Sequence, residues 1–188
     1  MNNKKKLFTI LLIFALLIGG ATVVYKKLSN YASANQLLEN QQNQNSDSPQ
    51  KEKAPDFTVY DASGNEVHLS DFIGKPIVLN FWASWCPPCQ MEMPDFEQMY
   101  LELGDEIQFL MINMTDGFRE TQKRAIDFIN ENEYSFPVLF DLKSNAASIY
   151  GVQNLPTTLF IDAEGNFVAY ATGAIDKATL KRGIDMIK

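Results

Sequence analysis

Residues 76–89 read PIVLNFWASWCPPC and pass from a strand pattern into a helix pattern. Its first seven residues form a nearly continuous apolar run, which is typical of a strand buried on both faces. Residues 86–103 then carry apolar side chains at helical spacing and end before Gly104, a C-cap residue. The apolar positions are Cys89, Met93, Phe96, Tyr100 and Leu103. Because a second apolar run occupies 107–113, the sequence predicts a strand–helix–strand unit with two cysteines where the first strand meets the helix.

The segments on either side of this unit alternate between strand and helix patterns. Residues 57–60 and 66–69 flank the turn-forming run DASGN and predict a hairpin. Downstream, the patterns predict a polar-faced helix, a short strand, a short helix, a hairpin and a last helix, at 119–132, 138–141, 145–150, 157–161 with 167–172, and 176–187. Strands that alternate with helices and end in a hairpin indicate an α/β fold with a mixed sheet.

The N-terminus carries a long uncharged segment. Residues 7–25 contain no charged side chain and lie between three lysines at 4–6 and two at 26–27. A helix of this length spans about 30 Å of hydrocarbon. We expect a transmembrane signal-anchor, with a basic cytoplasmic tip at 1–6 and the rest of the chain outside the cytoplasm. The alternative is secretion after cleavage at the A-x-A-like site 32–34, which lies well beyond the apolar run.

The remaining chain divides into a tether and a body. Residues 26–53 are rich in Asn, Gln and Ser and predict a flexible tether. The body, 54–188, is large enough for a single core. Residues 1–50 hold five lysines and two acids (+3), whereas 51–188 hold 11 basic and 21 acidic groups (−10). This acidic body argues against a nucleic-acid partner, whose phosphates would need neutralising.

Two cysteines and one histidine limit the chemistry that the chain can perform. They cannot supply the four ligands of a zinc finger or a framework of several disulfides. Cys86 and Cys89 lie at a helix start, where unpaired N–H groups and a partial positive charge favour the thiolate. This location predicts Cys86 as a nucleophile and Cys89, on the apolar stripe, as the thiol that resolves a mixed disulfide.

The cysteine pair has three other interpretations. A purely structural disulfide that closes so short a loop would contribute only about 2 kcal/mol. Haem attachment needs a histidine after the second cysteine, where this chain has Gln90. A Cu(I) carrier using Cys86, Cys89 and His68 is chemically feasible, because thiolates favour Cu(I). Nothing in the sequence places His68 near the pair.

Several blocks resemble the thioredoxin superfamily and, within it, the membrane-anchored extracytoplasmic thiol-disulfide oxidoreductases of the TlpA/ResA-like group. They occur in the order of that group, at 54–57, 69–75, 79–89 and 151–158. The resemblance implies a thioredoxin fold, in which helices flank a mixed central sheet, with an added N-terminal β-hairpin, an inserted helix at 119–132 and one preceding transmembrane helix. The first blocks also look like peroxiredoxins, but Leu79 and Ala83 occupy the Pro and Thr/Ser positions of the peroxiredoxin site.

The same resemblance assigns substrate-facing residues. Pro156 is expected to form a cis peptide bond and to face the disulfide, and an X-Pro bond adopts that form at low cost. The backbone of Leu155 would then pair with a bound substrate chain as an added strand. An ordinary trans-proline before a strand is the alternative. Trp85 is expected to touch the substrate.

Glu92 is the candidate for moving protons. Thioredoxins place a buried Asp six residues before the first cysteine, and this chain has Asn80 there. Glu92 lies three residues after Cys89 and four before Phe96, on the apolar face of the helix, where burial would raise its pKa. Members of the ResA-like group carry a functional Glu at this spacing. The alternative is a Glu that merely stabilises the first helical turn.

The function implied is reduction of disulfides in extracytoplasmic partner proteins through the Cys86–Cys89 couple, with no further cofactor and no metal. The resemblance implies a transmembrane electron donor of the CcdA/DsbD type, membrane lipid around residues 7–25, and substrates such as apocytochrome c or a methionine sulfoxide reductase. The alternative in a different class is a non-catalytic Cu(I)-binding module with a thioredoxin-like fold.

Overall fold

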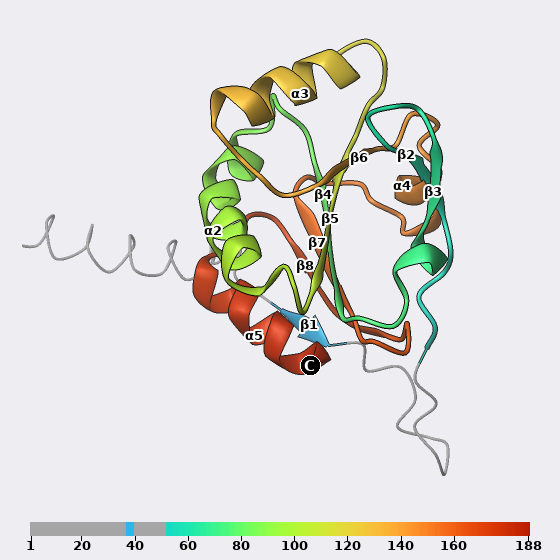
Figure 1. Ribbon diagram of the computed structural model, residues 1–188, viewed down its shortest axis with the longest axis vertical. Helices are drawn as coiled ribbons and strands as arrows, with labels where there is room; N and C mark the ends of the chain where they lie inside the picture. Colours follow the sequence, from blue (N-terminus) through green and yellow to red (C-terminus); the bar gives the residue numbers. More distant parts are fainter. Residues whose placement is uncertain (1–36, 40–51) are drawn as a thin grey trace, which may run out of the picture. The chain divides into compact units, whose positions relative to one another are not determined.

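The computed structural model describes residues 37–39 and 52–188. In these residues one mixed sheet has eight strands in the order β1-β8-β7-β4-β5-β6-β2-β3, with helices on both faces (Figure 1). The strands are β1 Leu38–Glu39, β2 Thr58–Tyr60, β3 Glu66–His68, β4 Ile77–Trp82, β5 Gln108–Asn113, β6 Val138–Phe140, β7 Thr157–Ile161 and β8 Phe167–Thr172. The helices are the short 3-10 helix η1 Leu69–Phe72, α2 Pro87–Leu103, α3 Gln122–Glu131, α4 Asn145–Ile149 and α5 Lys177–Ile187. This arrangement confirms the predicted α/β fold with a mixed sheet.

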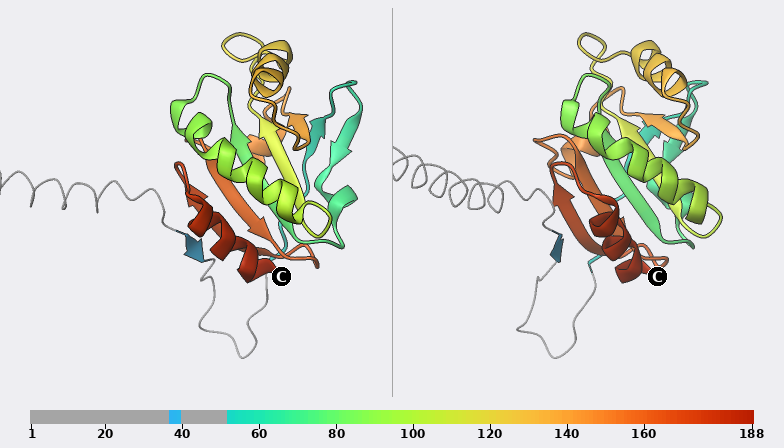
Figure 2. Two further views of the ribbon diagram at one scale, coloured as in Figure 1. Left: turned by 60° about the vertical axis from the view of Figure 1, so that its left-hand side comes forward. Right: turned by 90° about the vertical axis from the view of Figure 1, so that its left-hand side faces the viewer.

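Strand β4 lies at the centre of the sheet. It pairs in parallel with β5 and antiparallel with β7, and all six of its residues are buried. A strand covered on both faces requires apolar side chains on both, which explains the unbroken apolar run in the sequence. Helix α2 connects β4 to β5 across one face of the sheet, so the predicted strand–helix–strand unit is present (Figure 2).

Each face of the sheet has its own apolar core. On one face, α2 and α5 pack against the sheet through side chains that include Met93, Phe96, Phe160, Leu180 and Ile184. On the other face, α4 and the residues around the β2–β3 hairpin cover a cluster that includes Val59, Leu79, Ile112, Ala146 and Leu159. The alternation of Leu159 and Phe160 between these two clusters follows from the two-residue period of a strand.

The predicted N-terminal hairpin is also present. Strands β2 and β3 pair antiparallel, and Asp61 closes their turn by accepting hydrogen bonds from the backbone N–H groups of Ser63 and Asn65, at 2.8 and 2.9 Å. Gly64 adopts φ +85° in this turn, a conformation that favours glycine. The hairpin joins the sheet where Tyr60 of β2 pairs with Phe140 of β6.

Two segments differ from the sequence predictions. The helix predicted at 119–132 begins only at Gln122, because the Thr121 hydroxyl caps it by accepting a hydrogen bond from the N–H of Arg124. Arg119 and Glu120 therefore belong to the preceding loop. Within the predicted tether, Leu38 and Glu39 form β1 and pair with Tyr170 and Ala169 of β8.

The predicted membrane-spanning segment belongs to the N-terminal part of the chain. Among the helices in 37–39 and 52–188, none has the length and apolar character needed to cross a bilayer. The basic tip at 1–6, the signal-anchor at 7–25 and the alternative cleavage site at 32–34 lie outside the described residues.

Candidate active site at the cysteine pair

A disulfide joins Cys86 and Cys89 at the start of α2, with their Cα atoms 5.3 Å apart. Cys86 is the N-cap residue, and its Sγ accepts a hydrogen bond from the N–H of Cys89 at 3.3 Å. Pro87 and Pro88 occupy the first helical positions, where an N–H group has no partner within the helix. Cys86 is 4% exposed and Cys89 is fully buried. Cys86 is therefore the cysteine that an incoming disulfide can reach.

Cys86 borders a cleft of about 450 Å³. Three segments line it: the start of α2, the residues that follow β5, and the loop before β7. The lining residues are Trp85, Cys86, Pro87, Pro88, Met114, Asp116, Val152, Gln153, Asn154 and Leu155. Two of these segments follow the neighbouring parallel strands β4 and β5. They lie together because the carboxyl ends of parallel strands meet at one edge of a sheet.

The Leu155–Pro156 peptide bond is cis, as the resemblance implied. Pro156 is buried, and Leu155 lines the same cleft as Cys86. In the described part of the chain, neither the N–H nor the C=O of Leu155 bonds to another backbone group. That backbone is therefore available to an extended chain lying in the cleft.

Glu92 lies one helical turn after Cys89 and is only 2% exposed. Its Oε2 accepts a hydrogen bond from the backbone N–H of Ile175 at 2.9 Å. Its Oε1 accepts one from the side-chain amide of Asn80 at 2.8 Å, and the same amide donates to the hydroxyl of Thr158 at 3.0 Å. Asn80, which stands where thioredoxins have a buried Asp, thus donates a hydrogen bond directly to Glu92, the candidate proton carrier.

Burial raises the pKa of Glu92 to about 8. The hydrogen bonds from Ile175 and Asn80 oppose this shift, because they stabilise the charged carboxylate, and the nearby charge of Asp95 adds to it. A carboxyl group with this pKa changes protonation near neutral pH. It is therefore able to give or take a proton in that range.

Two residues beside the cleft were not identified from the sequence. The Arg119 guanidinium carbon lies 3.3 Å from the centroid of the Trp85 ring, and Trp85 is 37% exposed. The carboxylate of Glu120 is buried and accepts hydrogen bonds from the N–H and hydroxyl of Ser84, the residue before Trp85. The only sequence signal for Arg119 and Glu120 is that they follow β5, the parallel neighbour of β4.

His68 does not join this site. It lies on β3 at the edge of the sheet, and three strands separate β3 from β4. Its Nδ1 lies 3.2 Å from the Thr58 hydroxyl of the partner strand. Within the described residues, no group of three or more His, Cys, Asp and Glu side chains is arranged to hold a metal ion.

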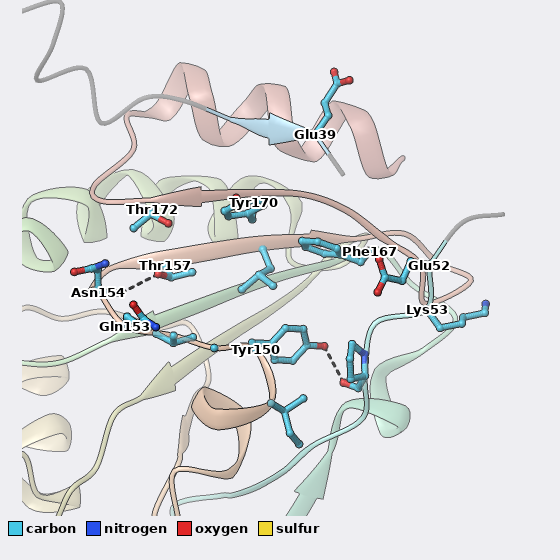
Figure 3. A pocket seen from close by; sticks show the side chains of 15 residues that line it. Glu39, Glu52, Lys53, Tyr150, Gln153, Asn154, Thr157, Phe167, Tyr170 and Thr172 are labelled. Atoms are coloured by element: carbon cyan, nitrogen blue, oxygen red, sulfur yellow. Dashed lines mark hydrogen bonds between the residues drawn. The ribbon is translucent and has the colours of Figure 1, made fainter. Parts of the chain in front are cut away.

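A second hollow of about 650 Å³ lies over β7 and β8 (Figure 3). The aromatic side chains of Tyr150, Phe167 and Tyr170 line it, and the Tyr150 hydroxyl donates a hydrogen bond to the carbonyl of Pro55. Residues 152–154 line both this hollow and the cleft at the cysteines. The two hollows therefore adjoin each other along the loop before Leu155.

Known proteins resemble this chain in sequence and in fold. Residues 51–170 match the model of the AhpC/TSA family. The thiol-disulfide oxidoreductase ResA of Geobacillus thermodenitrificans is 35% identical over 136 residues, which cover 72% of this chain and 76% of that protein. The thioredoxin-like protein YneN of Bacillus subtilis is 33% identical over 135 residues, covering 72% and 78%. A crystal structure of a putative thiol:disulfide interchange protein DsbE from Chlorobium tepidum superposes with a TM-score of 0.63 at 31% identity, covering 71% of this chain and 94% of that one. The chain therefore belongs to the AhpC/TSA family, among its thioredoxin-like thiol-disulfide oxidoreductases.

Proposed function

We propose that the protein reduces disulfides in partner proteins through the Cys86–Cys89 couple. The observation that carries the proposal is the position of the couple at the start of α2, where Cys86 borders a cleft that also exposes the backbone of Leu155. A helix start favours the thiolate of Cys86, and the cleft admits an extended chain beside it.

The reaction has two exchange steps. The Cys86 thiolate attacks one sulfur of the substrate disulfide, forms a mixed disulfide and displaces the other substrate sulfur as a thiolate. The Cys89 thiolate then attacks Cys86 Sγ and displaces the second substrate thiolate. The substrate gains two electrons, and Cys86 and Cys89 are left as the disulfide seen in the structure. A proton leaves the Cys89 thiol before the second step, and we assign its acceptor as Glu92.

The same proposal covers the membrane location of the enzyme, its electron donor and its substrates. The uncharged segment 7–25 anchors the chain in a membrane with the body outside the cytoplasm. A reduced couple is then regenerated by a transmembrane electron donor of the CcdA/DsbD type. Apocytochrome c and methionine sulfoxide reductases are the substrate classes that the resemblance suggests.

Reduction of a protein disulfide tests the proposal against the Cu(I)-binding alternative. The full chain is supplied with dithiothreitol, and the reduction of insulin is followed by turbidity, with Cys86→Ser as the inactive comparison. In parallel, the reduced protein is titrated with Cu(I) against a chelator of known affinity. We expect insulin reduction that depends on Cys86. Tight Cu(I) binding without thiol exchange would overturn the reductase proposal.

Membrane attachment is tested separately by fractionating cells that produce the full chain. An anchored protein stays with the membranes after alkaline carbonate washing. Recovery of a shortened protein in the medium, with an N-terminus close to residue 34, would support secretion instead.

A further inference from the structure

We propose that residues 116–120, here called the rim loop, form a second wall of the substrate site and select disulfides flanked by an acidic and an apolar side chain. The inference rests on the proposed function, because it concerns the protein chain that lies beside Cys86. Four observations carry it: the rigidity of the rim loop, its attachment to the residues before Cys86, the cation at Arg119 and the exposed ring of Phe118.

The rim loop is held in one conformation by hydrogen bonds to its own backbone. Asp116 Oδ1 accepts from the N–H groups of Phe118 and Glu120, both at 2.8 Å. Arg124, on the first turn of α3, donates to the carbonyls of Phe118 and Arg119 at 3.2 and 2.6 Å. Because these bonds hold the loop backbone, that backbone needs little further ordering when a ligand binds.

Glu120 fastens the rim loop to the active-site segment. Its buried carboxylate accepts hydrogen bonds from the N–H of Ser84 at 3.2 Å, the Ser84 hydroxyl at 2.7 Å and the side-chain amide of Asn113 at 2.9 Å. Ser84 lies two residues before Cys86, and Asn113 is the last residue of β5. The rim loop and the cysteine pair are therefore positioned by the same buried group.

Arg119 places a positive charge beside the cleft. Its guanidinium lies over the ring of Trp85, which lines the cleft together with Cys86. Among the described residues, Arg119 forms no ion pair with a carboxylate. Asp116 also lines the cleft and is a carboxylate there, because its pKa is lowered mainly by the backbone N–H groups of Glu120 and Phe118 and to a smaller extent by the charge of Arg119. These N–H groups partly compensate its negative charge, so Arg119 is the cation at the edge of the cleft that an acidic side chain can pair with.

Phe118 adds an apolar contact next to this charge. Its side chain is 89% exposed although the backbone that carries it is fixed. Burying an exposed aromatic ring against an apolar partner is favourable, and aromatic and Arg side chains are the residue types that dominate binding at interfaces. An exposed Phe beside an Arg that contacts Trp85, the residue before Cys86, fits the chain that flanks a substrate cystine.

The occupant that fits is thus an extended segment of a protein substrate. Its backbone lies along Leu155, its cystine meets Cys86, an acidic side chain reaches Arg119 and an apolar one covers Phe118. A segment with a basic side chain beside Arg119 would be disfavoured, because it would bring two like charges together at the edge of the cleft.

Matched peptide disulfides test the selection. Two peptides differ only in the residue beside their cysteine, Glu in one and Lys in the other, and each carries the same small thiol as leaving group. The full chain, reduced beforehand, is mixed with each peptide, and the second-order rate constant is measured by stopped flow. We expect the wild-type protein to prefer the Glu peptide by about fivefold or more, as for one partly desolvated ion pair. Arg119→Met should bring the ratio close to one, and Arg119→Glu should invert it.

Further comparisons make the test decisive. Lys123→Met removes an exposed charge from α3, where Lys123 pairs with Asp127, and should leave the peptide ratio unchanged. Phe118→Ser should lower the preference for a Leu-flanked over a Ser-flanked peptide, whereas Met91→Ser, at an exposed apolar position on α2, should not. If an Arg119 variant fails to fold, the wild-type ratio still has to fall as salt is added.

Two results separate the failure of this inference from failure of the proposed function. A Glu-to-Lys ratio that is the same in wild type, Arg119→Met and Arg119→Glu, or that does not respond to salt, would overturn the role of the rim loop alone. A wild-type protein that cannot reduce 2-hydroxyethyl disulfide would overturn the proposed function and this inference with it.

Discussion

Glu92 occupies a position on α2 that would ordinarily hold an apolar side chain. It shares the buried face of the helix with Cys89, Met93 and Phe96. The group is kept there by hydrogen bonds from Ile175 and Asn80 rather than by a cation, so burial dominates and raises its pKa to about 8. Both carboxyl oxygens accept a hydrogen bond at this site, whereas a side-chain amide could accept only through its single oxygen.

Replacing Glu92 with Gln tests whether the carboxyl moves protons. Glu92→Gln keeps the shape of the side chain but cannot accept a proton, so we expect disulfide exchange near neutral pH to slow by about tenfold to a hundredfold. The measurement is the rate of insulin reduction between about pH 5 and pH 9. Glu102→Gln, at an exposed position on the same helix, should behave as wild type.

The outcome that would contradict this role is a wild-type pH–rate profile in Glu92→Gln. Far-UV circular dichroism of both variants establishes that any change in rate is not a change in fold. A slower rate without a change in the shape of the profile would assign Glu92 to packing around Cys89 instead.

The sequence was informative about residues whose neighbours are local. The spacing of Cys86, Cys89 and Glu92 along one helix placed all three correctly at the start of α2. It could not reveal Glu120, because the contacts of that carboxylate with Ser84 and Asn113 depend on how two strands and a loop meet. A glutamate just before a polar helix reads as a surface residue until the fold is known.

At the scale of elements, the strands and helices were predictable where one face is strongly apolar. Helix α2 and strands β7 and β8 have the predicted positions, because their periodicity reports burial directly. The start of α3 was predicted three residues too early, because the polar run around it contains several residues that could cap a helix and does not single out Thr121. The short strand β1 was not expected, because two residues carry no periodicity.

The contact between α5 and β7 yields a prediction at this scale. A Cβ atom added to Gly183 would overlap the ring of Phe160 on β7, and Phe160 is itself fully buried. We therefore expect Gly183→Ala to destabilise the fold by about 1–3 kcal/mol, despite the better helix propensity of Ala. Urea unfolding of the variant measures the loss.

The matched comparison is Lys181→Ala on the exposed face of the same helix. It removes only the surface ion pair with Asp185, so the expected change is below about 0.5 kcal/mol. Equal unfolding midpoints for Gly183→Ala and the wild-type protein would contradict a tight contact between Gly183 and the ring of Phe160.

For the whole molecule, Glu92 makes the free energy of unfolding depend on pH. Its pKa in the folded state, about 8, lies above its ordinary value of 4.5, so the folded protein binds more protons between these values than the unfolded one. This contribution to stability is complete below about pH 4.5 and is lost as the pH rises through about 8. The rise in pKa from 4.5 to about 8 corresponds to a loss of at most about 5 kcal/mol in the free energy of unfolding.

Chemical unfolding at about pH 5 and about pH 8 checks this prediction. The difference in unfolding free energy between the wild-type protein and Glu92→Gln should shift in favour of the variant as the pH rises. A difference that stays constant across this range would mean that Glu92 titrates near its ordinary value in the folded protein.

The organisation of the whole chain was predictable only in part from sequence. Fold and family follow from blocks of sequence in a fixed order, and the structure and the related proteins bear them out. Membrane attachment, the electron donor and the substrate depend on surroundings that one folded chain does not contain. The proposed role of the rim loop concerns which disulfide-bearing segments this body accepts.

Capture of a substrate on Cys86 is the most direct test of the central claim that Cys86 and Cys89 exchange disulfides with partner proteins. In Cys89→Ser the first exchange step proceeds and the second cannot, so the mixed disulfide accumulates. The full-length variant is recovered from cells after acid quenching, and its adducts are identified by mass spectrometry before and after reduction. We predict a partner protein linked to Cys86, released by dithiothreitol and missing from the Cys86→Ser/Cys89→Ser variant. Recovery of folded Cys89→Ser with a free Cys86 thiol and no linked protein would contradict the account.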